Sequence, residues 1–407
     1  MYSKTASFFR YAFFAAFMLL LNSRTFASHI VGADLYYTHV SGNTYTVTFV
    51  AYGDCGPMSA AAFSTLPTSS PQICIYNGDT LINSISLTIV APIAGVEVTP
   101  LCPGDTSQCT SPTSTIPGVK KFVYSGNVTL PYTSSVWRFT YSGYNGTGSA
   151  AGRAAAITNL SSAGATVMQL VDTLNNASSA NSSTHLTVAQ QTFFCLNNPN
   201  NYNPGAVDPD GDDISITLTG AMSGAATTSC TATSTAVSYT GTAWPGTAIS
   251  AVTPIVCDSA MFSVAPATGD MLFTPNMVQR GVVVYNIEER RSGVLVGTSQ
   301  REMTVLVLTC SAGSFPCISS TTAAPEIINN EAAAEIYPNP ANDELAIKAG
   351  SGVYQSFTII NNVGQLMIQQ QITGPQTSVN IQTLPAGMYY ITLYGKSGTQ
   401  VRKFVKW

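Results

Sequence analysis

The residues most able to do chemistry form a short acidic run, Asp208-Pro209-Asp210-Gly211-Asp212-Asp213. Asp208, Asp210 and Asp212 alternate around a proline and a glycine, so their carboxylate oxygens can converge on one hard cation. Ca²⁺ takes about 6 to 8 such oxygens. The spacing therefore predicts a Ca²⁺ site at these three residues. The alternative is an Asp-rich β-turn with solvated carboxylates, because Asp, Pro and Gly each favour turns for their own reasons.

A β-strand must position this acidic run. Ile214, Ile216 and Leu218 alternate with Ser and Thr, which is the period of a strand. An EF-hand would place a helix and a ligating Glu here, and neither is indicated. The run resembles the DPDGD turn of cadherin-like and related Ig-like bacterial repeats, and residues 266–275 match the later half of such modules. The resemblance implies an Ig-like β-sandwich over residues 184–317. In it, the charged residues 288–291 are predicted to end a hairpin.

Signals for catalysis are few. The chain has three histidines, His29, His39 and His185, and no GxSxG, HExxH or phosphate-loop motif. We expect each histidine to be structural or exposed, and we predict that the protein is not an enzyme. Paired acids from distant parts of the chain could still form a site. A carbohydrate-binding or polymer-degrading secreted enzyme is therefore the alternative.

The nine cysteines indicate an oxidising compartment. They all lie between residues 55 and 317, and none forms a CxxC pair, which argues against zinc or redox motifs. We expect disulfides, with a pairing that the sequence does not decide. The odd number leaves at least one thiol free or paired between chains.

Composition limits the class of protein. Charged residues are only 9%, but hydrophobic residues reach 45%, enough to build cores. The net charge of −4, with no basic cluster, argues against nucleic acid as a partner. A chain of 407 residues is long enough for two or three domains.

Residues 1–27 have the three parts of a secretory signal peptide. Lys4 and Arg10 give a positive start, residues 11–21 are apolar, and small residues precede Ser28. The apolar run is shorter than the roughly 20 residues that span a bilayer. We therefore predict a secreted chain with no transmembrane anchor after signal cleavage.

The first mature region, residues 28–183, reads as a β domain. Tyr45, Val47 and Phe49 alternate with threonines, and similar short runs follow between Pro and Gly breaks. The Gly/Ala/Ser/Asn-rich residues 143–183 are predicted to be a flexible loop. The region resembles secreted adhesin-like proteins of Bacteroidota labelled gliding-motility-associated or PKD-like, on the segments Ser28-His29-Ile30-Val31-Gly32, Tyr52-Gly53-Asp54-Cys55 and Ala156-Ile157-Thr158-Asn159-Leu160. That family usually has Cys-Cys-Arg-Asn where this chain has Ser142-Gly143-Tyr144-Asn145.

The last region, residues 336–407, reads as a small antiparallel sandwich of short alternating runs. It resembles the type A C-terminal sorting domain of the type IX secretion system of Bacteroidota. The motif residues are Tyr337, Pro338, Asn339, Pro340, Gly364, Leu384, Gly387, Tyr389 and Lys403. The resemblance implies an Ig-like fold that is read by an outer-membrane translocon and usually removed as the cargo is attached to the cell surface or released.

Together these patterns predict an all-β protein. We expect tandem Ig-like or cadherin-like sandwich modules at residues 28–183 and 184–317, a linker at 318–335, and the small C-terminal sandwich. The predicted function is non-catalytic adhesion or binding at the cell surface. The predicted partners are the type IX translocon and sorting machinery, and a surface, glycan or protein ligand.

Overall fold

The structure is a computed structural model that describes residues 30–56, 63–102, 104–144, 152–224, 230, 234–243, 246–257, 262–310, 315, 334–348, 354–361, 366–395 and 398–407. The predicted signal peptide and residues 318–333 of the predicted linker lie outside these ranges. Strands dominate the described elements, so the all-β prediction is confirmed. Two 3-10 helices, η2 (Leu66–Thr68) and η3 (Ala163–Ala165), lie between strands.

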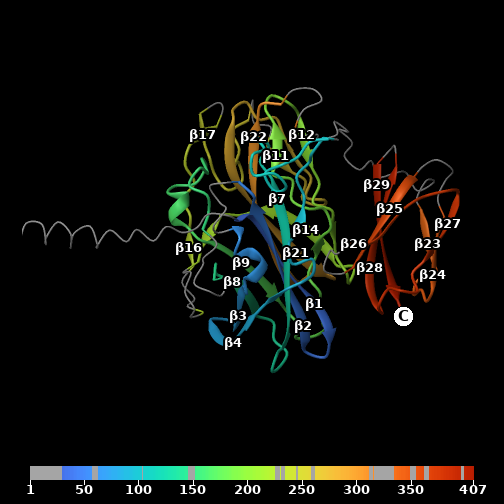
Figure 1. Ribbon diagram of the computed structural model, residues 1–407. Coiled ribbons are helices and arrows are strands. Elements are labelled where there is room, and N and C mark those ends of the chain that lie inside the picture. Colours follow the sequence, from blue (N-terminus) through green and yellow to red (C-terminus); the bar gives the residue numbers. More distant parts are fainter. Residues whose placement is uncertain are drawn as a thin grey trace, which may run out of the picture.

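One sheet of fifteen strands forms most of residues 30–310, which we call the body (Figure 1). Its main path runs β4 (Thr80–Ser86), β3 (Gln72–Asn77), β8 (Trp137–Tyr141), β9 (Met168–Leu174), β22 (Val294–Leu308), β1 (Ile30–Ser41), β2 (Thr44–Asp54), β7 (Val119–Thr129), β5 (Thr88–Ile89). The strands off this path are β6 (Val96–Glu97), β11 (Phe193–Cys195), β14 (Asp213–Leu218), β15 (Met222–Ser223), β16 (Thr235–Ala236) and β21 (Gln279–Arg291).

Three small sheets complete the body. They are β10 (His185–Leu186) with β13 (Ala206–Val207), β12 (Asn200–Tyr202) with β20 (Met271–Phe273) and β19 (Ser263–Val264), and β17 (Thr242–Ala243) with β18 (Thr247–Ala248).

Strand β22 pairs with strands from the other side of the domain boundary that was predicted between residues 183 and 184. It comes from the expected second module, yet it lies between β9 and β1 of the expected first module and pairs with both. A disulfide also joins Cys74 of β3 to Cys230. The body is therefore one continuous sheet and not two separate ones. Periodicity within short windows predicts strands, but it does not predict which distant strands pair.

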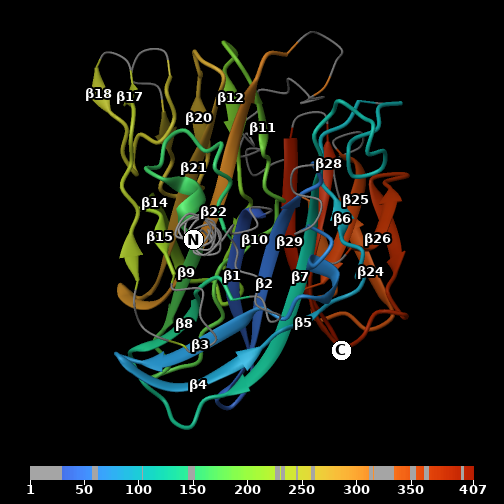
Figure 2. The same ribbon diagram turned by 60° about the vertical axis from the view of Figure 1, so that its left-hand side comes forward.

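The sheet curls until its two edges meet (Figure 2). β4 and β5 stand at opposite ends of the strand order, although only Leu87 separates them in sequence. Inside the curl lies a core in which aromatic residues from facing strands pack together, such as Phe49 of β2 against Tyr141 of β8, with ring centroids 4.1 Å apart. Alternate residues of each strand fill this core, as a half-buried strand requires.

The long hairpin of β21 and β22 carries a second core. Tyr285 and Ile287 of β21 and Val305 of β22 pack against Phe273 of β20. Ser292 and Gly293 close the hairpin with φ of 51° and 82°. Positive φ at both central residues is the geometry of a two-residue hairpin turn. The hairpin end predicted for residues 288–291 is therefore confirmed.

The flexible loop predicted at residues 143–183 is wrong for most of its described part. Residues 168–174 form β9 inside the sheet, and Asn181 and Ser183 are fully buried. The hydroxyl of Ser183 accepts a hydrogen bond from the Tyr37 amide at 2.8 Å. Small polar residues are used here because they fit beside the backbone of β1, not because the segment is loose.

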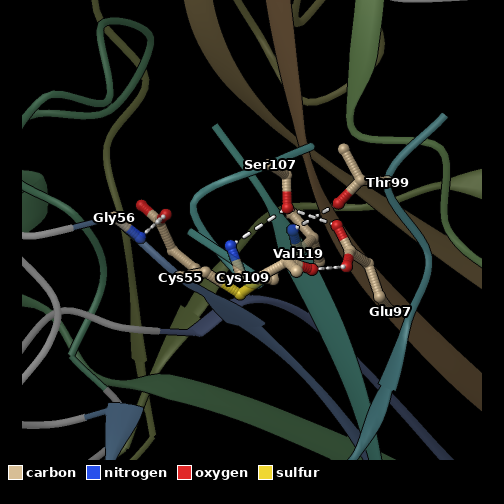
Figure 3. Close-up of a disulfide and its surroundings, with 9 residues drawn as sticks. Cys55, Gly56, Glu97, Thr99, Ser107, Cys109 and Val119 are labelled. Atoms are coloured by element: carbon tan, nitrogen blue, oxygen red, sulfur yellow. Dashed lines mark hydrogen bonds between the residues drawn. A yellow bond between two sulfur atoms is a disulfide. The ribbon is translucent and has the colours of Figure 1, made fainter. Parts of the chain in front are cut away.

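The cysteines form disulfides, as predicted. The pairs are Cys55–Cys109, Cys74–Cys230 and Cys195–Cys310; Cys102 is also disulfide-bonded, and Cys257 is free and buried. Figure 3 shows the first pair, which ties the end of β2 to the loop before β7. There the Ser107 hydroxyl donates to Glu97 and accepts from the Cys109 amide at 3.0 Å.

The C-terminal residues form a separate sandwich (Figure 1). One sheet holds β23 (Glu335–Tyr337), β24 (Glu344–Lys348) and β27 (Gln376–Asn380); the other holds β26 (Leu366–Gln371), β25 (Tyr354–Asn361), β28 (Gly387–Gly395) and β29 (Gly398–Lys406). Leu345, Phe357, Val379 and Ile391 meet in its core. The small C-terminal sandwich is confirmed.

Candidate functional site

The acidic run forms a tight turn between β13 and β14. Gly211 has a φ of 81°, a conformation that favours glycine. One carboxylate oxygen of Asp208 accepts hydrogen bonds from the amides of Asp210 and Asp212, each at 2.9 Å. Ligand oxygens of Asp208, Asp210 and Asp212 all lie within 4.8 Å of one another. The structure therefore brings the three predicted metal ligands together. We call residues 208–212 the acidic turn.

An arginine already pairs with one carboxylate of the acidic turn. Arg291, at the end of β21, makes two hydrogen bonds of 2.7 Å to the carboxylate of Asp212 and lies 3.6 Å from Asp210. The bond to Asp212 raises the pKa of Arg291. Because the Asp212 side chain is only 3% exposed, this carboxylate is not simply solvated. The sequence predicted a charged hairpin end for residues 288–291 and gave no sign of the pairing between Arg291 and Asp212.

The donor set of the acidic turn suits Ca²⁺ in chemistry, because it consists of carboxylate oxygens. Asp208 would offer its second oxygen, which is 3.4 Å from the Thr184 hydroxyl. A cation at Asp212 would share the carboxylate with Arg291, whose guanidinium takes one lone pair of each oxygen and repels the charge of the cation. Ca²⁺ at this turn stays a prediction.

A buried carboxyl lies behind the turn. Glu289 of β21 is fully buried and accepts hydrogen bonds from the Thr184 amide at 2.5 Å and from Asn181 at 2.8 Å. Burial raises its pKa to about 7, and the nearby Asp208 carboxylate acts in the same direction. Burial also raises the pKa of Asp208 itself. Glu289 continues the alternation of Tyr285 and Ile287 along β21, so the period of the strand was the signal that this Glu faces inward.

Two buried ion pairs flank β22. Arg301 bonds to Asp34 of β1 at 2.6 and 2.8 Å, and Glu302 bonds to Arg153 twice at 2.6 Å. Asp34 and Arg301 are register partners in neighbouring strands. Arg301 and Glu302 are adjacent in sequence, so they point to opposite faces of the sheet. The signal in the sequence was a pair of adjacent opposite charges, Arg301 and Glu302, in the interior of a long strand.

The sorting motifs meet at one edge of the C-terminal sandwich. Asn339 donates to the Lys403 carbonyl at 3.1 Å and accepts from the Val405 amide at 2.9 Å, which joins the first motif to the last. Tyr389 stacks on Phe404, and its hydroxyl donates to the Pro385 carbonyl at 2.8 Å. These contacts hold β29 in place.

The other predicted motif residues fall around this edge. Tyr337 ends β23 and is exposed, Pro338 and Pro340 follow cis peptide bonds, Leu384 is buried before β28, and Gly387 begins β28. Gly364 lies outside the described residues. The ammonium of Lys403 points away from its own sandwich and donates to the carbonyl of Pro209 in the acidic turn. Two motifs that sequence analysis treated separately are therefore in contact.

The histidines match the prediction that they are structural or exposed, as far as they are described. His185 is buried, and burial lowers its pKa to about 4. His39 lies near the end of β1, where its ring contacts the Gly42 carbonyl at 2.9 Å. His29 lies outside the described residues.

Residues 335–407 match the family described as the secretion system C-terminal sorting domain. The match begins one residue before the predicted boundary and confirms the predicted domain. It implies export by the type IX secretion system and attachment at the cell surface. Among the described residues, no helix is long and apolar enough to cross a membrane. No curated protein sequence matches the chain.

Several solved immunoglobulin-domain structures are weakly similar. Drosophila OTK, extracellular domains 3-5, is 9% identical, with 83% of this chain and 85% of that chain covered and a TM-score of 0.15. The I-band fragment I67-I69 from titin is 9% identical, with 92% and 96% covered and a TM-score of 0.16. Dscam1 isoform 4.44 is also 9% identical, and only 53% of its chain is spanned, at a TM-score of 0.15. Scores this low carry no argument about fold or function.

Proposed function

We propose that this protein is a non-catalytic adhesion or binding protein displayed at the cell surface, after export through the type IX secretion system. The observation that carries the proposal is the match of residues 335–407 to the sorting-domain family. That sandwich has its own core and its own two sheets, so it can act as a secretion signal while the body has a different function.

The build of the body supports a contact role outside the cell. Three disulfides tie strands and loops that lie 54 to 156 residues apart in sequence. Disulfides of this kind persist in oxidising surroundings. Two ion pairs of the body, Arg153–Glu302 and Arg301–Asp34, are buried within the sheet, which fits a rigid scaffold that presents its loops to a partner.

Mass spectrometry of the native protein, from washed cells and from the medium, tests this proposal. We expect a chain that begins near Ser28, lacks the residues after about Glu335 and carries an added mass that marks a surface anchor. A chain that keeps residues 336–407 and stays in the periplasm would overturn the export role. Release of products from a polymer by the purified body, in place of binding without turnover, would overturn the non-catalytic role.

A further inference from the structure

Tyr390 is buried although it points away from the core of its own domain. Along β28 the residues Tyr389, Ile391 and Leu393 fill the core of the C-terminal sandwich. Successive side chains in a strand point to opposite faces, so Tyr390 faces outward. It is nevertheless only 1% exposed. A tyrosine on the outer face of a sandwich reaches that burial only when another part of the protein covers it.

The covering part is the body. The Tyr390 hydroxyl lies 3.3 Å from Nδ1 of His185, and the two rings meet edge to face with centroids 5.8 Å apart. His185 packs in turn on Tyr36 of β1, with centroids 4.7 Å apart, and its Nε2 lies 3.2 Å from the Thr38 hydroxyl. Both ring nitrogens of this neutral imidazole are thus partnered, one by the body and one by the C-terminal domain.

Lys403 adds a second contact on the same face. It lies directly opposite Tyr390 in the register of β28 and β29. Its ammonium donates to the Pro209 carbonyl, in the middle of the acidic turn. Asp208 and Asp210 are close enough to help raise the pKa of Tyr390, although burial is the larger cause. In both views, β28 and β29 lie on the side of the sandwich that faces the body (Figure 1 and Figure 2).

We propose that the sorting domain docks on the body of its own chain through Tyr390 and Lys403, and that it masks a body surface made of Tyr36, His185 and the acidic turn. The masking role rests on the proposed function, since the surface is uncovered when the tail is removed at the cell surface. The docked tail is then both a secretion signal and a domain that covers this surface of the body. The protein becomes able to use this surface only after export has finished.

The test uses the mature chain, residues 28–407, and follows His185 by NMR titration. The wild-type ring is expected to titrate near pH 4, because it is buried between Tyr36 of the body and Tyr390 of the docked tail. In the double variant Tyr390→Ala/Lys403→Ala we expect an upward shift in the pKa of His185, toward the ordinary value of about 6.5, because one side of the ring is then open to water. Hydrogen exchange at residues 184–186 and 208–212 should rise in the same variant.

A matched control comes from the same domain. Tyr337→Ala/Lys348→Ala also removes one tyrosine and one lysine, but these side chains are exposed by 39% and 60%. The control should leave the titration of His185 unchanged. Tyr390→Phe, which keeps the ring, should give a smaller shift than Tyr390→Ala and serves if the double variant unfolds. A wild-type His185 that titrates near 6.5, or a double variant identical to the wild type, would overturn docking. Retention of the tail on native cells would remove the masking role alone.

Discussion

Removing the carboxylate of Asp34 should destabilise the body strongly. Asp34→Ala leaves the guanidinium of Arg301, which is 0% exposed, without its counter-charge. Breaking a buried ion pair in this way costs about 3 to 5 kcal/mol. Gln190, at 2.8 Å, and the Tyr52 hydroxyl, at 3.3 Å, also lose their acceptor. We therefore expect a loss near the upper end of that range in the free energy of unfolding.

Chemical denaturation of the mature chain measures this loss. Asp79→Ala is the control, because Asp79 is fully exposed and lies 3.8 Å from Arg138; we expect no resolvable change. The double variant Asp34→Leu/Arg301→Met should recover most of the stability, since apolar side chains can replace a buried pair at little cost. Equal losses in Asp34→Ala and Asp79→Ala would refute the reasoning. So would two separate transitions within residues 30–310, because the pair joins β1 to β22 in one sheet.

Three further predictions concern the acidic turn and the disulfides. The pKa of Glu289 rises from 4.5 to about 7 on folding, so its contribution to stability is present below pH 4.5 and is lost as pH rises through 7. At about 1.4 kcal/mol per pKa unit, the free energy of unfolding should fall by about 3 kcal/mol between pH 4.5 and 7. Glu289→Gln should flatten this part of the plot of unfolding free energy against pH. An unchanged slope would contradict the raised pKa of Glu289. If Ca²⁺ binds at Asp208, Asp210 and Asp212, EDTA should lower the Tm and added Ca²⁺ should restore it. Asp212→Asn should reduce this difference in Tm. Identical Tm values with and without Ca²⁺ would contradict Ca²⁺ binding at the acidic turn. Replacing Cys195 and Cys310 together by serine should cost about 2 to 5 kcal/mol in denaturation experiments, and the Cys55–Cys109 pair somewhat less because it closes a shorter loop; no loss for either pair would count against a stabilising role.

Local patterns predicted most strands and the C-terminal domain correctly. Ile214, Ile216 and Leu218 do form β14, and residues 335–407 do form the sorting sandwich. The pairing of β22 with β1 and β9 was out of reach, because it depends on contacts between residues more than 100 positions apart. For the same reason, the sequence identified the carboxylates of the acidic turn but not Arg291, which comes from another strand. The sequence did not predict the burial of Tyr390, because alternation along one strand places this tyrosine on the outer face, where it is expected to be exposed.

The position of β22 also constrains when the body can fold. Its residues, 294–308, are the last strand of the body in sequence, yet they lie at the centre of the sheet and pair with β1 at the other end. The sheet between β9 and β1 is therefore incomplete until residue 308 has been made, and pairings this distant form slowly. The Cys195–Cys310 disulfide fastens the end of β22 to β11, which pairs with it in parallel. The sorting sandwich instead makes its strand pairings within residues 335–406, some of them between neighbours in sequence such as β28 and β29. The sorting sandwich should thus fold quickly and independently of the body. Docking through Tyr390, in contrast, requires β1 and β10 to be in place. A docked tail would then mark a body that has completed its sheet.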